Sequence, residues 1–302
     1  MLVGYLYFNK AADKSVAELS KRWTDETSQF LDIAGMRIHL KDEGPKSDEA
    51  PIILIHGTSA SLHTWDGWAN KLKENRRVIR FDLPGFGLTG PEPQKHYTIE
   101  RYSEVLIAVL DKLTIQKGVL AGNSLGGYIA WATAVFSPDR VSELILVDSS
   151  GYPFESKSVP LAFKLSKNPL TSELLKNILP RSLVAQSVKN VYGNPDLVTE
   201  QLIDRYYDLT LREGNRAALK DRFEQTLPGA LAEKIHSINI PTLIIWGKKD
   251  QLIPLKFGLK FNDEIENSQL IVFDELGHVP HEEDAQATVS VVEQFLQHNS
   301  SQ

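Results

Sequence analysis

The sequence predicts an α/β fold in which a mostly parallel sheet carries helices on both faces. Short apolar runs alternate with segments of helical periodicity along most of the chain. One long stretch, residues 152–236, interrupts this alternation with helical patterns alone. The 302 residues, 42% of them hydrophobic, are enough for one large core with an insertion. We therefore expect an N-terminal extension (1–28), a core (29–151 and 237–302) and a helical insertion (152–236).

The N-terminus leaves two interpretations open. Met1 to Phe8 are apolar, but a membrane-spanning helix needs about 20 such residues. The segment is either the remnant of a membrane anchor, which would allow membrane association, or a short piece that packs on the body of the protein, the interpretation we favour. Residues 17–23 then predict a short helix. We expect a soluble body, and the compartment stays open between cytoplasm and periplasm.

The core elements follow in chain order. Apolar and polar residues alternate in 30–33 and in 36–40, and Ala34-Gly35 lies between the two segments. This pattern predicts an antiparallel hairpin at one edge of the sheet. Apolar runs predict the further strands 51–55, 77–81, 117–121, 144–147, 241–247 and 268–273. Apolar residues at helical spacing predict a helix over 98–113 with Thr98 as its N-cap, and a closing helix over 283–297. Within the insertion, helices are predicted over 164–179 and 198–212.

The chemistry begins at the motif Gly122-Asn123-Ser124-Leu125-Gly126, which lies between a predicted strand and a predicted helix. A Gly-x-Ser-x-Gly motif in that context is typical of a nucleophile elbow, a sharp turn that exposes a serine hydroxyl above the sheet. The two glycines avoid a Cβ clash when the serine is forced into a strained conformation. Ser124 is therefore the candidate nucleophile.

A serine hydroxyl needs a histidine base, and the base needs a carboxylate to orient it. Asp250 follows the strand 241–247, and His278 follows the strand 268–273 beside a glycine. Asp148, at the end of the strand 144–147, is kept as a second candidate acid.

The other histidines receive different interpretations. His281 precedes two glutamates at an expected helix start, so we expect it to cap the helix or to lie in solvent. His39 and His298 are interpreted as surface residues. His56 follows the strand 51–55 and is expected to shape a loop. Thr58, in that loop, and Leu125 are predicted to donate the backbone amides of an oxyanion hole.

Five motifs stand in a characteristic order. They are His56-Gly57, the stretch Asp82-Leu83-Pro84-Gly85-Phe86-Gly87-Leu88-Thr89, the elbow, Trp246-Gly247-Lys248-Lys249-Asp250, and Gly277-His278. From about residue 29 onward the chain thus resembles the α/β-hydrolase superfamily, specifically its esterase-like members with a helical cap.

The resemblance implies hydrolysis of carboxylic esters of short to medium acyl chain. The reaction would use Ser124, His278 and Asp250, with an acyl-enzyme and with neither a metal nor an organic cofactor. The insertion would form a cap over the serine, and Phe154, Phe163 and Tyr206 are candidates for pocket walls or for the interior of the cap.

Related enzymes supply the alternatives. Haloalkane dehalogenases and epoxide hydrolases use an aspartate nucleophile, which Ser124 disfavours. Carbon–carbon bond hydrolases of ring-cleavage products share an Asn-Ser elbow and are the runner-up, although they usually carry a tryptophan where Val279 follows His278. A non-catalytic binding protein on the same fold is the third alternative.

Composition narrows the partners. A formal net charge of −6 and a pI near 5.8 argue against nucleic acid or an anionic membrane surface as the main partner. The chain has no cysteine, which excludes disulfides, thiol catalysis and cysteine-based metal sites. A small-molecule ester is the expected partner, and the oligomeric state stays open.

Overall fold

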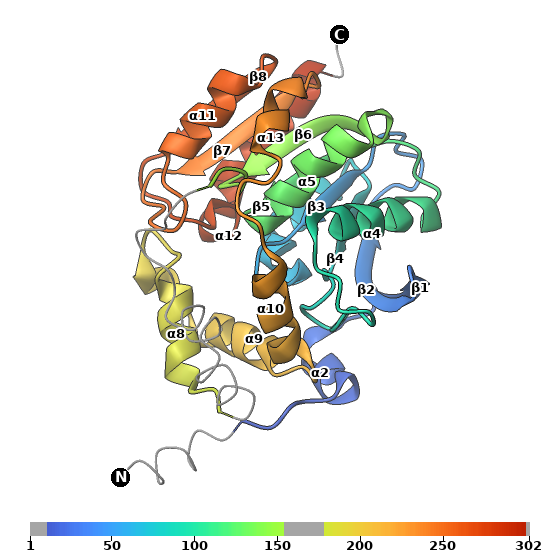
Figure 1. Cartoon of the computed structure of the whole chain (residues 1–302), viewed down its shortest axis with the longest axis vertical. Coiled ribbons are helices and arrows are strands. Elements are labelled where there is room, and N and C mark those ends of the chain that lie inside the picture. The colour runs from blue at the N-terminus through green and yellow to red at the C-terminus, as the bar shows by residue number, and fades with distance from the viewer. Residues whose placement is uncertain (1–10, 154–177, 300–302) are drawn as a thin grey trace.

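The computed structural model describes residues 11–153 and 178–299 (Figure 1). Its centre is one eight-stranded sheet with the order β1-β2-β4-β3-β5-β6-β7-β8. The strands are β1 Ser28–Ile33, β2 Met36–Glu43, β3 Ile52–Ile55, β4 Val78–Phe81, β5 Gly118–Asn123, β6 Val141–Val147, β7 Thr242–Gly247 and β8 Ser268–Phe273. The pairs from β4 to β8 are parallel, whereas β1 and β2 are antiparallel to their neighbours. The predicted mostly parallel sheet is confirmed.

The edge hairpin forms where the sequence predicts it. Ala34 and Gly35 both have positive φ angles, 51° and 80°, which is the backbone that a tight two-residue hairpin turn requires. The central strands β3, β4, β5 and β7 are buried along their whole length. Helices therefore cover both faces, and this double burial explains why these strands are apolar runs rather than alternating patterns.

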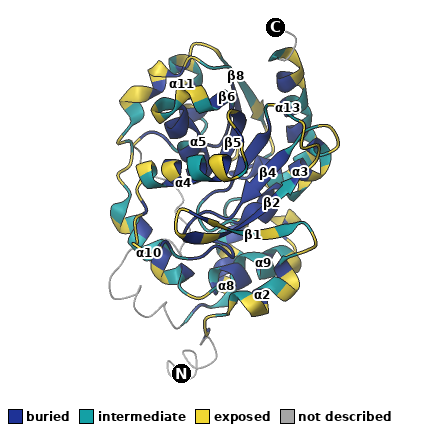
Figure 2. Cartoon of the chain, turned by 90° about the vertical axis from the view of Figure 1, so that its right-hand side faces the viewer, coloured by how far each residue is buried: buried dark blue, intermediate teal, exposed yellow. Residues whose placement is uncertain are grey.

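Two groups of helices cover the sheet. The helices are α3 Asp66–Leu72, α4 Ile99–Lys112, α5 Leu125–Phe136, α11 Lys256–Glu264, α12 Pro280–Glu283 and α13 Ala285–Asn299. Side chains of α4, α5 and α11, such as Leu106, Trp131 and Phe261, pack in one core cluster. Those of α3 and α13, such as Trp68 and Val292, pack in another. Figure 2 shows the buried central strands between these helices, whose outward surfaces are exposed.

Two predicted helix ends can be compared with the structure. The Thr98 hydroxyl accepts the backbone N–H of Arg101, so the predicted N-cap of α4 is confirmed. The predicted closing helix over 283–297 is divided in the structure. Asp284 leaves the helical conformation between α12 and α13, with φ −137° and ψ 76°.

The described part of the insertion, between β6 and β7, is helical. It contains α8 Arg181–Lys189, η3 Pro195–Leu197, α9 Glu200–Thr210, α10 Asn215–Gln225 and η4 Ala232–Ser237. Figure 1 shows α8 and α9 beyond the ends of the strands rather than against a face of the sheet. The helix predicted over 164–179 lies mainly outside the described residues. The end of the insertion joins the core, because η4 contacts α5 and α11.

The N-terminal segment is attached to the insertion. Helix α2, Val16–Trp23, contacts α9, and the indole N–H of Trp23 donates to Asp208 Oδ2 at 3.0 Å. Lys14 Nζ lies 2.8 Å from the other carboxylate oxygen of Asp208. Met1 to Phe8, on which the anchor interpretation depends, lie outside the described residues. Within 11–153 and 178–299, no helix is long and apolar enough to span a membrane.

Candidate active site

Ser124 lies on a sharp turn between β5 and α5. Its backbone has φ 54° and ψ −114°, a conformation that non-glycine residues rarely adopt. The glycines on either side are required by close backbone contacts. A Cβ at Gly122 would lie 2.1 Å from the carbonyl oxygen of Gly126, and a Cβ at Gly126 would lie 2.0 Å from that of Ile55. The elbow predicted from the sequence is present in the structure.

Two backbone amides are available beside this serine. Gly57 packs against it so closely that an added Cβ would lie 3.2 Å from Ser124 Cβ, which brings the loop with Thr58 alongside Ser124. Leu125 begins α5, so its N–H has no acceptor in the preceding turn. Within the described part of the chain, neither Thr58 N–H nor Leu125 N–H donates to a protein acceptor. Both amides are therefore available to an oxyanion.

Asp250 and His278 form a buried pair. His278 Nδ1 lies 2.7 Å from Asp250 Oδ2. The other carboxylate oxygen, Oδ1, accepts the backbone N–H groups of Leu252 at 2.7 Å and Ile253 at 2.9 Å. The carboxylate is thus held by its own loop, and the imidazole is oriented with Nε2 as its remaining polar atom.

Asn123, the neighbour of Ser124, connects the elbow to the histidine loop. Its Nδ2 donates to the backbone carbonyl of His278 at 2.9 Å and to that of Val147 at 3.1 Å. The structure therefore brings together three loops that follow β5, β7 and β8, as expected where carboxyl ends of parallel strands share one edge. Ser124, Asp250 and His278 all lie on these loops.

Glu283 is a site residue that the sequence reasoning missed. Its Oε1 accepts the N–H of Gly277 at 2.7 Å, and its Oε2 accepts those of Gly193 at 2.8 Å and Asn194 at 3.3 Å. The His278 N–H donates to Val191 O at 2.7 Å. The insertion and the histidine loop are thus joined by the Glu283 carboxylate and by this backbone hydrogen bond. In the sequence, Glu282 and Glu283 indicated only the N-terminus of a helix. No local signal pointed to the contacts that Glu283 makes.

We expect Glu283→Gln to weaken both folding and catalysis. A glutamine would replace one carboxylate oxygen by an NH2 group, which cannot accept the hydrogen bond that Gly193 or Gly277 N–H now donates. Each buried donor left without an acceptor costs about 1–3 kcal/mol. Urea unfolding should show a loss of that size, and kcat should fall because the His278 loop loses its restraint. The matched control is Glu275→Gln, at an exposed side chain, which should leave both measurements unchanged. Equal behaviour of the two variants would contradict the role of Glu283.

His281 differs from the sequence interpretation. The expectation that it caps a helix or lies in solvent is wrong, because α12 packs on η1 (Leu62–Trp65) and α3 and buries the ring completely. Its Nε2 lies 3.1 Å from Thr64 Oγ1, and the ring centroid lies 4.0 Å from that of Trp65. Burial, followed by the nearby charges of His278 and Arg205, lowers the pKa of His281 well below its usual range. His281 is therefore a neutral core residue.

His39 also differs from its interpretation as a surface residue. It lies on β2, between β1 and β4, and is fully buried. Its Nδ1 lies 2.7 Å from Asp82 Oδ2, so a second acid–histidine pair lies away from the elbow. His298 is exposed, as expected. His56 accepts the Leu83 N–H at Nε2 and contacts Gly57 O through Nδ1, so both ring nitrogens hold loops.

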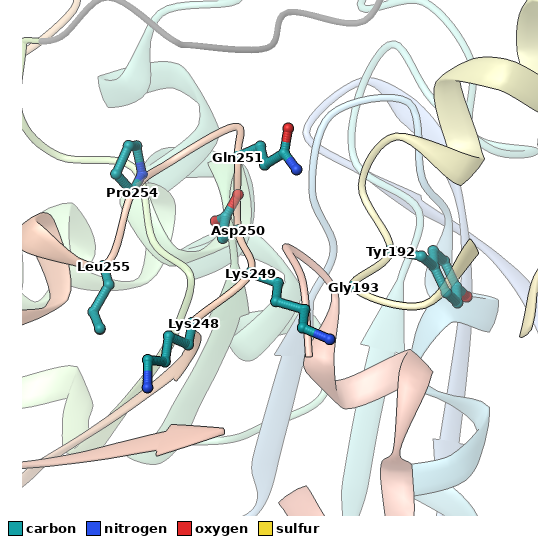
Figure 3. Close-up of a pocket in the computed structure, with 8 residues that line it drawn as sticks. All are labelled: Tyr192, Gly193, Lys248, Lys249, Asp250, Gln251, Pro254 and Leu255. Carbon is teal, nitrogen blue, oxygen red and sulfur yellow. The ribbon is translucent and has the colours of Figure 1, made fainter. Parts of the chain in front are cut away.

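Asp250 borders an open hollow of about 400 Å³ (Figure 3). Its lining residues are Tyr192, Gly193, Lys248, Lys249, Asp250, Gln251, Pro254 and Leu255. Lys248 and Lys249 pair with Asp274 and Glu275, so their charges are already matched. Of the expected pocket-wall residues, Phe154 and Phe163 lie outside the described residues. Tyr206 donates to Glu282 Oε2 at 3.0 Å.

Comparison with known proteins agrees with the fold. A family model described as alpha/beta hydrolase fold matches residues 50–285. Fold and match together show that the chain belongs to the α/β-hydrolase family, as the five motifs indicated.

Two curated relatives match nearly the whole chain. A 2-hydroxy-6-oxo-2,4-heptadienoate hydrolase from Pseudomonas putida is 30% identical over 283 residues, which cover 90% of this chain and 96% of the relative. A 2-hydroxymuconate semialdehyde hydrolase from Pseudomonas sp. strain CF600 is 31% identical, with 90% and 94% covered. Among solved structures, a meta-cleavage product hydrolase from Pseudomonas fluorescens IP01 superposes with a TM-score of 0.77 at 26% identity, with 90% and 98% covered.

Proposed function

We propose that this protein is a serine hydrolase that cleaves a carbon–carbon bond in an open-chain product of aromatic ring cleavage. The observation that carries the proposal is the nearly full-length likeness to two hydrolases named for such substrates. The Asn123-Ser124 elbow, which carbon–carbon bond hydrolases of ring-cleavage products share, supports it. The relatives thus favour the carbon–carbon alternative over the ester interpretation.

In this proposal Ser124 attacks the ketone carbon while His278 takes its proton, and Asp250 keeps the imidazole in the required tautomer. The amides of Leu125 and Thr58 hold the oxyanion, each contributing roughly 3 kcal/mol if it is well aimed. His278 then returns the proton to the leaving dienolate and later activates the water that releases the acyl group. The described part of the insertion would belong to a cap that excludes other water during these steps.

The first relative is named for the substrate 2-hydroxy-6-oxo-2,4-heptadienoate, and hydrolysis of that compound balances. Water and 2-hydroxy-6-oxo-2,4-heptadienoate would give 2-hydroxypenta-2,4-dienoate and acetate. The proton of the 2-hydroxyl would first move to carbon 5, which gives the 2-oxo form. The bond between carbons 5 and 6 then breaks, its electron pair is delocalised onto the 2-oxo oxygen, and that oxygen takes a proton and becomes the hydroxyl of the product. Carbon 6 gains the serine oxygen first and the oxygen of water afterwards.

Ester hydrolysis is the second candidate, and a specific observation favours it. Val279, in the place of the usual tryptophan, is buried in an apolar cluster of the insertion. The buried guanidinium of Arg205 is ion-paired with Glu282, four residues after His278, so it is already neutralised. An uncharged ester of short to medium acyl chain suits such surroundings better than a dienoate carboxylate does.

Parallel assays distinguish the two candidates. We expect kcat/KM for 2-hydroxy-6-oxo-2,4-heptadienoate, followed by loss of dienol absorbance, to exceed that for p-nitrophenyl esters of two to twelve acyl carbons by roughly a hundredfold. Ser124→Ala should abolish both activities. The reverse order of the two substrates would favour the esterase.

A third outcome would overturn both candidates. If no substrate turned over although a serine-directed phosphonate labelled Ser124, the protein would be a binding protein with an accessible serine. Rates that survive in Ser124→Ala would instead remove the serine as nucleophile.

A further inference from the structure

Asp148 is a second carboxyl at the acid end of the site, and the proposed mechanism does not use it. It follows β6 directly, has a φ of 43°, and is fully buried. Its Oδ1 accepts the backbone N–H of Gly247 at 3.1 Å. A positive φ is unusual outside glycine and is tolerated best by aspartate and asparagine. The residue thus occupies a constrained position where only one protein N–H donates to it among the described residues.

Asp148 lies next to the Asp250–His278 pair. One polar atom from each of the three side chains lies within 4.8 Å of the other two. Asp250 already receives two amides on one oxygen and the imidazole on the other. Glu283, from α12, is a further acidic group, and its charge also raises the pKa of Asp148. Among the described residues, the titratable groups around Asp148 are therefore the carboxyls of Asp250 and Glu283 and the imidazole of His278.

We propose that Asp148 is a neutral, protonated carboxyl that donates a hydrogen bond to Asp250 and so acts as a positioning residue for the catalytic acid. This inference rests on the proposed role of Asp250 as the residue that orients His278. It assigns the two carboxyls different states, with one negative charge shared by the pair.

Electrostatics of the site support this assignment. Two buried carboxylates at such separation repel each other strongly, and a single imidazole cannot offset both charges. Burial raises the pKa of Asp148 well above its usual value, and the charge of Asp250 and the hydrogen bond to it raise it further. The Gly247 N–H acts in the opposite direction and is outweighed. A protonated Asp148 also gains what a carboxylate lacks, a proton to donate to Asp250.

The first experiment reads the proton directly in the whole, ligand-free protein. Infrared difference spectroscopy near neutral pH, where ordinary carboxyls are ionised, should show the C=O stretch of one protonated aspartic acid. An aspartate-specific ¹³C label separates this band from Glu283, whose pKa burial also raises. The band should disappear in Asp148→Asn. Absence of the band in the unmodified protein overturns the proposal, whether or not the enzyme turns over either proposed substrate.

The second experiment uses two variants suited to the positive φ. Asp148→Asn keeps a hydrogen-bond donor, and Asp148→Gly removes it without backbone strain. We expect Asn to retain kcat within about threefold and to leave the midpoint of the acid limb of kcat/KM unchanged, because no charge is removed. Gly should lower kcat about tenfold and move that midpoint to higher pH, because Asp250 then stabilises the charged imidazole more strongly.

The opposite charge state predicts a different profile. If Asp148 were ionised, Asp148→Asn would remove a negative charge beside His278 and move the midpoint of the acid limb down by about one to two pH units. That shift overturns the proposal, and so does a loss of activity in Asp148→Gly with no shift of the midpoint, which is what a merely structural role predicts. If the unmodified enzyme hydrolyses neither substrate, the proposed function fails, and the infrared band still decides the state of Asp148.

Discussion

Asp250→Asn and His278→Ala should each lower kcat by roughly 10⁴ while the protein stays folded. Asp250→Asn loses control of the imidazole tautomer and stabilisation of its charge, both of which depend on the 2.7 Å contact between the two side chains. His278→Ala removes the imidazole that takes the serine proton. Circular dichroism should show an unchanged fold, because Asn keeps an oxygen for the Leu252 and Ile253 amides. Steady-state kinetics on the better of the two proposed substrates measures the effect.

Matched controls separate this effect from general damage. Asp148→Asn should keep activity within about threefold, a change of ~0.7 kcal/mol in the barrier. His236→Ala removes an exposed imidazole and should change nothing. If Asp148→Asn were inactive while Asp250→Asn stayed active, the catalytic acid would follow β6 rather than β7, and the assignment of Asp250 would be wrong.

Asp82→Asn should lower the free energy of unfolding by about 3–5 kcal/mol. Asp82 is fully buried and accepts hydrogen bonds from the backbone N–H groups of Leu62 and Leu88, both at 2.8 Å, as well as contacting His39. An asparagine would turn an N–H group toward one of these donors and leave His39 without its charge partner. Urea unfolding at neutral pH measures the loss. Asp32→Asn, at an exposed position on β1, is the control.

The difference in unfolding free energy between the protein and Asp82→Asn should decrease at low pH. Burial by itself would raise the pKa of Asp82, but the His39 charge and hydrogen bond outweigh it and hold the pKa well below its ordinary range. A carboxyl with a depressed pKa in the folded state stabilises above its unfolded pKa of about 4, and that contribution declines as pH falls further. The difference between the protein and Asp82→Asn should therefore shrink below about pH 4. A difference that grows there would contradict the depressed pKa.

Local sequence predicted the elements that bring the candidate residues to one edge of the sheet. Apolar runs identified the strands of the core, and a glycine on each side of Ser124 marked the elbow, because backbone strain and close packing restrict the residues that such a turn accepts. The order of serine, aspartate and histidine after three strands was the basis for choosing Asp250 and His278 over their competitors. The relatives, rather than the motifs, favoured a carbon–carbon bond over an ester.

The surroundings of these residues were decided by contacts between distant parts of the chain. His39 meets Asp82 across 43 positions, and Asn123 meets the carbonyl of His278 across 155. Packing of the loops and the insertion likewise buries His281 and places Asp148 beside Asp250. The same packing brings Glu283 to the backbone N–H of Gly193. The sequence by itself determined the fold and selected the candidate residues Ser124, Asp250 and His278, because strand burial and the elbow leave local patterns. Only the tertiary structure decided which acids and histidines are buried together, because charge and hydrogen bonding depend on neighbours that are far away in the chain.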